Sequence, residues 1–467
     1  MAWSRAEILK ATGGKLARAG ERSRYGEVVT DSGKARIGSV FVALKGERHD
    51  GHRFIAEAVR RGASCVIAHR QVARRALGNA TLVRVGDTLR ALGDLAHFRR
   101  RQLGPKVLAI TGSNGKTTTK EMLAAIFEEA SLQGQTLRGR VLKTEGNFNN
   151  LVGLPLTLLR LRKRHKVAVV ELGTNHPGEI ERLARIAAAD FAIITSVAAA
   201  HLEGLHSLPG VAREKGALYR NLSAGGAIAV NLDDPWVRRL GARFKGEKWT
   251  YGRGGQVQAQ HVKLRNARGM SFTLRAGKRH CAVRLNYLGE HNVGNALGAA
   301  AMALAAGASL SAVRRGLAKA KPYAMRMQLE NWRGVGIIND AYNANPASMR
   351  AALRTLAEVP GRGKKMAALG DMFELGRHSR SEHRELGKAA AKAGLDHLYL
   401  LGARAQIVRS GALDAGMAAA KVTVGKDHKD IAARLRAAAR AGDWLLIKGS
   451  RGMAMEKVLR ELTAEKA

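Results

Sequence analysis

The sequence predicts an α/β fold that is divided into three domains. At 467 residues the chain is too long to fold around one hydrophobic core. Short apolar runs of strand length alternate with stretches of helical spacing, a pattern that favours sheets covered by helices. Gly104 and Pro105 are typical of a linker. We therefore expect domains at residues 1–104, 105–319 and 320–467.

The first domain is predicted to be a small α/β unit. Apolar runs at residues 28–29, 39–44, 64–68 and 81–85 indicate short strands, and residues 54–59 have helical spacing. A helix over residues 88–101 is expected to lead into the linker.

The second domain opens with a segment that is typical of phosphate binding. Residues 107–110 predict a buried strand, and a glycine-bearing turn leads from it to a helix that begins at Lys116. Backbone N–H groups, the helix dipole and the lysine charge then converge on one point. Ile110 stands where G-x-x-x-x-G-K-[ST] has its first glycine, so the match to that pattern is incomplete. An ordinary strand-to-helix turn is the alternative, but Gly-Lys-Thr-Thr after a buried strand favours a nucleoside triphosphate.

We therefore expect a P-loop ATPase-like central domain, in which the Thr117 hydroxyl is placed to hold Mg²⁺. The candidate nucleotide-binding residues of the loop are Gly112, Ser113, Asn114, Gly115, Lys116, Thr117 and Thr118.

Further polar residues follow the next predicted strands. Glu171 ends the apolar run 167–171, and His201 lies just past the run 192–197. Since the carboxyl ends of parallel strands meet at one edge of a sheet, both side chains are candidates for holding Mg²⁺ or a water beside the phosphate loop. The alternatives are a carboxylate paired for structural reasons and a structural histidine. A helix is predicted to begin at residue 210, and the position of Lys215 in it predicts an ordinary helix lysine that is exposed to solvent.

Two groups of side-chain amides suggest ligand recognition. Residues 144–150 are dense in hydrogen-bonding side chains, which suits a loop that binds a polar ligand. Asn292 and Asn295 stand one helical turn apart at the start of an Ala-rich helix, on a face that is placed to read a nucleobase. Residues 261–285, which lie between these two groups in the sequence, alternate in polarity well enough to predict a β-meander.

The last domain is predicted to be Rossmann-like, with a doubly wound and largely parallel sheet. Strand-like runs lie at residues 335–339, 365–369, 397–401, 422–424 and 444–448, and helices begin near Ser348, Ser381 and Asp427. Gly334 and Gly336 resemble the start of a dinucleotide fingerprint, but no third glycine or helix follows. This argues against NAD binding.

Composition excludes several classes. The net charge of +41 would suit a nucleic-acid-binding protein, but the basic residues are dispersed and aromatic residues make up only 4%. We therefore expect no specific nucleic-acid binding and read the charge as a solvated surface or as attraction of anionic substrates. No apolar run reaches eighteen residues, so membrane insertion is not expected. The first ten residues lack a signal-peptide core, and two distant cysteines suit a reducing cytoplasm.

These motifs occur together, in this order, in one family. The chain resembles the Mur ligases, ATP-dependent amide-forming enzymes of bacterial cell-wall precursor synthesis, over nearly its full length. The resemblance rests on residues 111–118, 146–150, 171–175, 201–203, 291–295 and 448–451. Residues 342–346 and 369–375 are similar to the dipeptide-adding member, which joins D-alanyl-D-alanine to UDP-N-acetylmuramoyl-tripeptide.

The resemblance implies a mechanism. The γ-phosphate of ATP passes to the terminal carboxylate of the tripeptide, and the amine of the dipeptide attacks the resulting acyl phosphate. Direct amide formation is hindered because a carboxylate is a poor electrophile. Catalysis then consists of positioning two anions and neutralising their charge. The first domain would bind the UDP part of the substrate, and the enzyme is expected to be a cytoplasmic monomer.

The resemblance also implies residue roles. Lys116 would hold the β- and γ-phosphates and Thr117 one Mg²⁺, while Glu171 and His201 would bind metal. Lys215 matches a lysine that is carbamylated in the family, which would help to anchor a second Mg²⁺. The other implied contacts are Asn292 and Asn295 with adenine, Arg326 with the ATP phosphates, Asp340 with ribose, Ser32, Thr144, Asn147 and Asn150 with the UDP-tripeptide, and Tyr342, Asn343 and Asn345 with the dipeptide.

The chain departs from the family pattern at three places. Gly33 follows Ser32 where the family usually has arginine, so one contact to the uridine nucleotide is either lost or supplied by Lys34 or Arg36. Asn339 precedes Asp340 where an acid pair is common, and Ala217 stands where a glutamate is frequent. Three alternatives remain: a sibling amide ligase such as the tripeptide-forming or folate polyglutamate-type enzymes, a basic ATPase acting on nucleic acid, and a silent binding protein.

Overall fold

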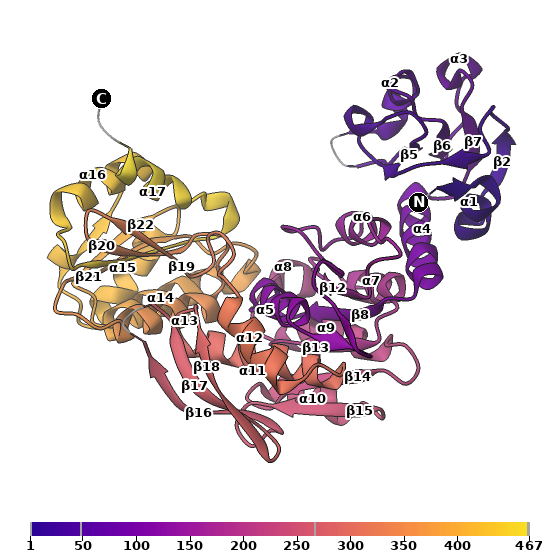
Figure 1. The fold of residues 1–467 in the computed structure, drawn as a ribbon. Coiled ribbons are helices and arrows are strands. Elements are labelled where there is room, and N and C mark those ends of the chain that lie inside the picture. The colour runs from indigo at the N-terminus through magenta and orange to yellow at the C-terminus, as the bar shows by residue number, and fades with distance from the viewer. Residues whose placement is uncertain (1, 47–48, 266–267, 465–467) are drawn as a thin grey trace.

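The computed structural model describes residues 2–46, 49–265 and 268–464. Its main sheets have five, nine and six strands and follow one another along the chain. In Figure 1 the nine-stranded unit lies between the other two, and helix α4 (Thr88–Leu103) runs from the N-terminal unit into it. The predicted three-part α/β architecture is thus confirmed.

The N-terminal sheet has the order β2-β7-β6-β5-β4, in which only the β2–β7 pair is antiparallel. All four predicted strands are present, and β2 was not predicted. The elements are β1 (Trp3–Ser4), α1 (Arg5–Thr12), β2 (Lys15–Arg18), β3 (Arg24–Tyr25), β4 (Val28–Val29), β5 (Val40–Val42), α2 (Ile55–Arg60), β6 (Cys65–Ala68), α3 (Arg74–Leu77), β7 (Thr81–Arg84) and α4.

Helix α4 begins and ends at residues that stop a helix. Asp87 accepts hydrogen bonds from the backbone N–H groups of Leu89 and Arg90, and Gly104 closes the other end in the left-handed conformation, at φ 60°. Gly104 is therefore a helix cap as well as the start of the linker.

The central sheet has the order β11-β12-β8-β13-β14-β15-β16-β17-β18, parallel up to β16 and antiparallel beyond. The predicted β-meander is therefore confirmed as β16–β18, with residues 266–267 outside the described part. The elements are β8 (Lys106–Thr111), α5 (Lys116–Glu128), β9 (Ser131–Leu132), β10 (Gln135–Thr136), β11 (Val141–Lys143), α6 (Gly153–Leu159), β12 (Val167–Glu171), α7 (Glu179–Ala187), β13 (Phe191–Ile194), α8 (Leu202–Leu205), α9 (Leu208–Arg220), β14 (Ala227–Asn231), α10 (Pro235–Ala242), β15 (Glu247–Tyr251), β16 (Val257–Leu264), β17 (Met270–Ala276), β18 (Arg279–Leu285), α11 (Glu290–Ala305) and α12 (Leu310–Lys319).

Strand β8 is buried on both faces, which explains its continuous apolar run. Leu108 and Ile110 pack into the core under α5, α11 and α12. Val107 and Ala109 point the other way, into the core under α6, α7 and α9. Helices cover both faces of the sheet, so its carboxyl edge is the place left open to a ligand.

The C-terminal sheet has the order β19-β20-β24-β21-β22-β23, with β19 antiparallel at its edge. All five predicted strands are present, while β19, α15 and α17 were not predicted. The elements are β19 (Gln328–Trp332), β20 (Val335–Asp340), α13 (Pro346–Glu358), β21 (Lys365–Gly370), α14 (Ser379–Lys392), β22 (His397–Leu401), α15 (Ala405–Asp414), β23 (Val422–Val424), α16 (His428–Ala438), β24 (Trp444–Lys448) and α17 (Glu456–Thr463).

Two cores flank this sheet, one under α13, α14 and α15 and one under α16 and α17. This is the doubly wound arrangement that the sequence predicts. Within the described residues, no helix is long and apolar enough to cross a bilayer.

Candidate active site

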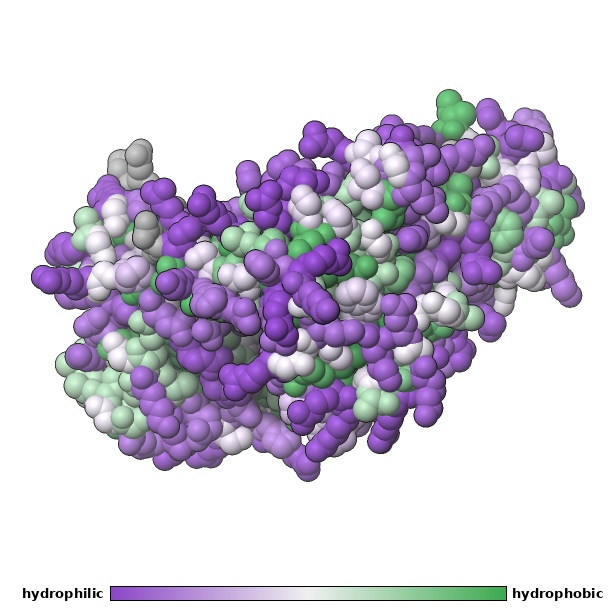
Figure 2. Space-filling model, turned by 60° about the horizontal axis from the view of Figure 1, so that its bottom comes forward, coloured by the Kyte–Doolittle hydropathy of each residue, from purple (hydrophilic) through white to green (hydrophobic). Residues whose placement is uncertain are grey.

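A cavity of about 1060 Å³ separates the central and C-terminal units. We call it the interdomain cleft. The surface view in Figure 2 is dominated by hydrophilic side chains, with apolar ones scattered among them. The predicted site residues that line the cleft are Ser113, Asn114, Gly115, Lys116, Thr118, Asn147, Asn150, Glu171, His201, Asn292, Asn295, Arg326, Asp340, Tyr342, Asn343 and Asn345. The structure thus gathers positions that are spread over about half of the sequence.

The phosphate loop joins β8 to α5 and needs its glycines. Gly112 and Gly115 have φ values of 150° and 81°. A Cβ at Gly112 would lie 1.9 Å from Thr195 Oγ1, and one at Gly115 would lie 2.2 Å from Asn295 Oδ1. Neither position has room for a side chain, so the backbone of the loop stays accessible.

The loop is held against the end of β13. The Ser113 N–H donates to the Ser196 carbonyl oxygen at 2.8 Å, and the Asn114 N–H donates to Ser196 Oγ at 3.1 Å. Lys116 Nζ donates to the Gly112 carbonyl oxygen at 2.8 Å, curling back over the loop. Burial lowers the pKa of Lys116, and the nearby Glu171 opposes that shift. The loop is therefore preorganised as an anion cradle with a cation at its centre.

Glu171, at the carboxyl end of β12, is only 1% exposed. It accepts hydrogen bonds from Thr117 Oγ1 and from Asn149 Nδ2, each at 2.9 Å. No lysine, arginine or histidine of the described residues forms an ion pair with it. Oxygen ligands and an uncompensated carboxylate are what Mg²⁺ requires, so Glu171 and Thr117 fit that ion. Across the described part of the chain, no three His, Cys, Asp or Glu side chains cluster as a metal site.

Lys215 lies on α9 beneath the loop and is 1% exposed. None of the described residues forms a hydrogen bond or ion pair with its amine. Burial, and then the like charge of Lys116, hold the pKa of Lys215 well below its usual value. The reading of Lys215 as a solvated helix lysine is therefore wrong, and a buried amine with a lowered pKa fits the chemistry of carbamylation.

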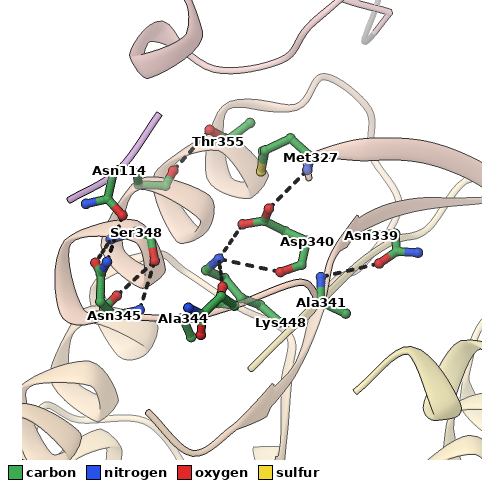
Figure 3. Close-up of polar contacts among 12 residues, drawn as sticks. Asn114, Met327, Asn339, Asp340, Ala341, Ala344, Asn345, Ser348, Thr355 and Lys448 are labelled. Atoms are coloured by element: carbon green, nitrogen blue, oxygen red, sulfur yellow. Dashed lines mark hydrogen bonds and ion pairs between the residues drawn. The ribbon is translucent and has the colours of Figure 1, made fainter. Parts of the chain in front are cut away.

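The C-terminal unit reaches the phosphate loop through Asn345. Asn345 Nδ2 donates to Asn114 Oδ1 at 2.7 Å (Figure 3). The same side chain caps α13 by accepting from the Ser348 N–H at 2.9 Å. An amide that serves as a helix cap is held rigidly, and so it fixes the distance between the two walls of the cleft.

A buried ion pair supports the C-terminal wall. Lys448 Nζ, on β24, lies 2.5 Å from Asp340 Oδ2 and donates to the Asn343 carbonyl oxygen at 2.9 Å (Figure 3). Asp340 Oδ1 accepts from the Met327 N–H at 3.0 Å. Both carboxylate oxygens of Asp340 thus already have partners within the protein.

Arg326 and the two asparagines of α11 form another part of the lining. The Arg326 guanidinium lies 4.0 Å from the Tyr342 ring centroid, and its Nε is buried without a hydrogen-bond partner among the described residues. Asn292 donates to the Leu288 carbonyl oxygen at 2.8 Å and accepts from Asn295 Nδ2 at 2.9 Å. Asn292 therefore positions Asn295, whose Oδ1 faces Gly115.

Comparison with known proteins identifies the family. Family models described as the Mur ligase family catalytic domain, the Mur ligase middle domain and the Mur ligase glutamate ligase domain match residues 24–100, 110–303 and 325–451. The chain is 36% identical to UDP-N-acetylmuramoyl-tripeptide–D-alanyl-D-alanine ligase of Bacillus subtilis, over 93% of this chain and 92% of that one. The chain belongs to the Mur ligase family.

Solved structures support the same conclusion. MurF from Acinetobacter baumannii is 34% identical to this Mur ligase, with a TM-score of 0.91 over 100% of this chain and 99% of that one. MurF from Thermotoga maritima, solved in complex with ADP, is 29% identical, with a TM-score of 0.83 over 94% and 97% of the two chains.

Four of the predicted residues lie beneath the lining of the cleft and one lies elsewhere. Gly112 and Thr117 belong to the phosphate loop but do not line the cleft, and Lys215 is buried on α9. Thr144 is fully buried, and its Oγ1 accepts from the Glu171 N–H at 3.0 Å. Ser32 belongs to the N-terminal unit, where its hydroxyl donates to Glu57 Oε2 at 3.0 Å.

Sequence reasoning gave no role to several residues of this Mur ligase that shape the cleft. Asn149 and Glu374 belong to the motifs at residues 146–150 and 369–375, but neither was given a role of its own. Their hydrogen-bond partners, Glu171 and His201, are distant in sequence. His291 and Arg354 line the cleft as well. Burial lowers the pKa of His291 to about 4, so its ring is neutral at pH 7. Only the folded arrangement reveals these roles.

Proposed function

We propose that this chain is an ATP-dependent ligase that joins D-alanyl-D-alanine to UDP-N-acetylmuramoyl-tripeptide and forms the pentapeptide precursor of peptidoglycan. The full-length likeness to ligases named for that reaction carries the proposal. We further propose that it acts as a cytoplasmic monomer, in three domains at residues 1–104, 105–319 and 320–467.

ATP would bind at the phosphate loop. The cradle of residues 112–118, with Lys116 at its centre, is shaped for the β- and γ-phosphates. Arg326, whose Nε has no partner, would meet the phosphates from the other wall, and Asn295 would meet the adenine. The relative that was solved with ADP supports this assignment. Asp340 is already bound to Lys448 and Met327, so a contact with ribose would be shared with those partners.

Two Mg²⁺ ions would be held by Thr117, Glu171, His201 and Lys215. They would neutralise charge on the phosphates and the acyl group. Lys215 would contribute only after its neutral amine attacks CO₂ and loses a proton, which turns a buried base into a carbamate anion. The lowered pKa of Lys215 favours that reaction, because only the neutral amine is a nucleophile and an ammonium is not.

The two peptide substrates would meet between the walls of the cleft. Tyr342, Asn343 and Asn345 line the C-terminal wall and would hold the dipeptide; Asn147 and Asn150 line the opposite side and would hold the UDP-tripeptide. Thr144 would act through Glu171, and Ser32 would contact the UDP part from the N-terminal domain. The tripeptide carboxylate would take the γ-phosphate, and the dipeptide amine would displace it from the acyl phosphate.

The test is phosphate release from ATP with UDP-N-acetylmuramoyl-tripeptide and D-alanyl-D-alanine, with product mass as a second readout. We expect turnover only with the dipeptide, and a product heavier by one dipeptide less water. Parallel reactions contain single amino acids or DNA in place of the dipeptide. Turnover with a single amino acid would identify a sibling ligase, and stimulation by DNA alone would refute the proposal.

A further inference from the structure

His201 and Glu374 meet across the interdomain cleft. His201 Nδ1 lies 2.5 Å from Glu374 Oε2, although the two residues are 173 positions apart. His201 precedes α8 of the central unit, and Glu374 lies in the segment after β21 of the C-terminal unit. The histidine side chain is 19% exposed and the glutamate 48%, so the contact sits at the open edge of the cleft.

Both residues have a backbone conformation that a side chain disfavours. His201 has φ 55° and Glu374 has φ 61°, and neither is a glycine. Such conformations are strained for residues other than glycine and persist where the surrounding structure requires them. Two of them on either side of one hydrogen bond indicate that the contact has a use.

The segment that carries Glu374 is fixed on both sides. The Glu203 N–H donates to the Glu374 carbonyl oxygen at 3.2 Å, which ties the segment to α8. The Phe373 N–H donates to Ser450 Oγ at 2.8 Å, and Leu375 is buried in the C-terminal core. The carboxylate is therefore presented by a rigid support rather than by a free loop.

The direction of the hydrogen bond follows from the charges. A glutamate side chain that is 48% exposed is a carboxylate at pH 7 and can only accept a hydrogen bond. His201 Nδ1 therefore carries the proton, and Nε2 is the ring nitrogen left for a ligand. Metal-binding histidines commonly have this arrangement, in which a carboxylate fixes the tautomer and the ring orientation.

We propose that Glu374 is a positioning residue that orients His201 for a divalent cation, and that the C-terminal domain thereby completes the metal site of the central domain. This inference rests on the proposed metal role of His201. Because the two halves of the contact belong to different domains, cation binding and docking of the C-terminal domain would favour each other. The site would bind its cation tightly only when the cleft is assembled.

The test is Mn²⁺ binding to the full chain, measured from the EPR signal of free Mn²⁺ in bicarbonate buffer. Glu374→Gly removes the carboxylate and suits the left-handed backbone, so the variant should fold at least as well as the parent. We expect its dissociation constant for Mn²⁺ to rise about 10- to 100-fold. For Glu374→Gln, which keeps an acceptor oxygen, the dissociation constant for Mn²⁺ should lie between those of the parent and of Glu374→Gly.

Two controls separate the possible failures. Glu385→Gln removes an exposed carboxylate of the same domain that pairs with Lys388, and it should leave Mn²⁺ binding unchanged. His201→Ala sets the full effect of losing the ligand. Weakened binding in His201→Ala but not in Glu374→Gly would overturn this inference alone. Unchanged binding in both would refute the metal role of His201 and the inference with it.

Discussion

Replacing Lys215 with methionine should stabilise this protein and abolish its ligase activity. The amine is 1% exposed and has no partner among the described residues. Methionine has a similar length and no charge to desolvate. Replacing buried charged groups with apolar ones of similar volume is neutral or stabilising by about 1–4 kcal/mol. We expect a gain of that size for Lys215→Met in metal-free and bicarbonate-free buffer, together with loss of ligase activity.

The gain should depend on pH in a defined direction. The pKa of Lys215 is lowered in the fold, so between the folded and unfolded pKa values the unfolded chain binds more protons. The parent protein then gains stability as the pH rises toward the ordinary lysine pKa, by up to about 1.4 kcal/mol per pH unit. The advantage of Lys215→Met should therefore be larger near pH 7 than near pH 9.5.

Lys120→Met is the matched control. Lys120 is also fully buried, but its Nζ donates to the Thr144 carbonyl oxygen at 2.8 Å and lies 3.0 Å from Glu121 Oε1. Its removal leaves the buried Thr144 carbonyl oxygen without this donor, although Glu121 keeps its ion pair with Lys143, and should destabilise the fold by about 1–3 kcal/mol. The unfolding free energy of the central domain alone is measured by urea unfolding, with hydrogen exchange of peptides from β12 to α9 as the readout. A destabilised Lys215→Met, or a gain independent of pH, would refute the reasoning.

Three further substitutions test the walls of the cleft. Gly115→Ala forces a Cβ to within 2.2 Å of Asn295 Oδ1 at a residue whose φ is 81°. The resulting strain of about 1–3 kcal/mol should weaken ADP binding at least fivefold, as measured by calorimetry. Unchanged affinity would contradict the geometry of the loop. Asn345→Ala removes the cap of α13 and should lower the unfolding free energy of the C-terminal domain by about 1 kcal/mol, whereas Asn345→Asp should keep the cap and lose the bond to Asn114. Lys448→Met leaves Asp340, whose side chain is only 14% exposed, without its cation and should cost up to about 3–5 kcal/mol in denaturant unfolding. Lys448→Arg is the milder comparison, and a neutral effect of Lys448→Met would mean that Asp340 is not held by this pair.

The parts of the fold that the sequence predicts are those with strong local patterns. Residues 107–110 and 167–171 are continuous apolar runs because both faces of the sheet are covered, and both are strands. Strand β19 was missed since its residues Gln328–Trp332 are half-buried at a sheet edge and mostly polar. Helix α15 contains Gly411, where a Cβ would lie 2.1 Å from the Arg384 carbonyl oxygen of α14. There glycine permits close helix packing, whereas in isolation it argues against a helix.

The site was predictable as a set of residues, but the contacts among them were not. Asn114 and Asn345 are 231 positions apart, and Asp340 and Lys448 are 108 apart. Pairing at such separations depends on how two domains dock, which local pattern does not encode. The same limit applies to Lys215, because only the packing of α9 against the central sheet turns a helix lysine into a buried amine.

The distribution of buried charge explains why this cleft is the place for chemistry. Away from it, buried cations are neutralised by carboxylates: Arg100 by Asp190 at 2.8 Å, and Lys120 by Glu121. Around the phosphate loop, the buried Glu171 carboxylate and the Arg326 guanidinium form no ion pair among the described residues. An unpaired buried charge is costly, so the apo fold carries a free-energy penalty there that phosphates and divalent cations would relieve. Binding of nucleotide and cation should then be cooperative: a nucleotide with its cation should stabilise the central domain more than either does alone, because each supplies the charge that the other leaves unbalanced.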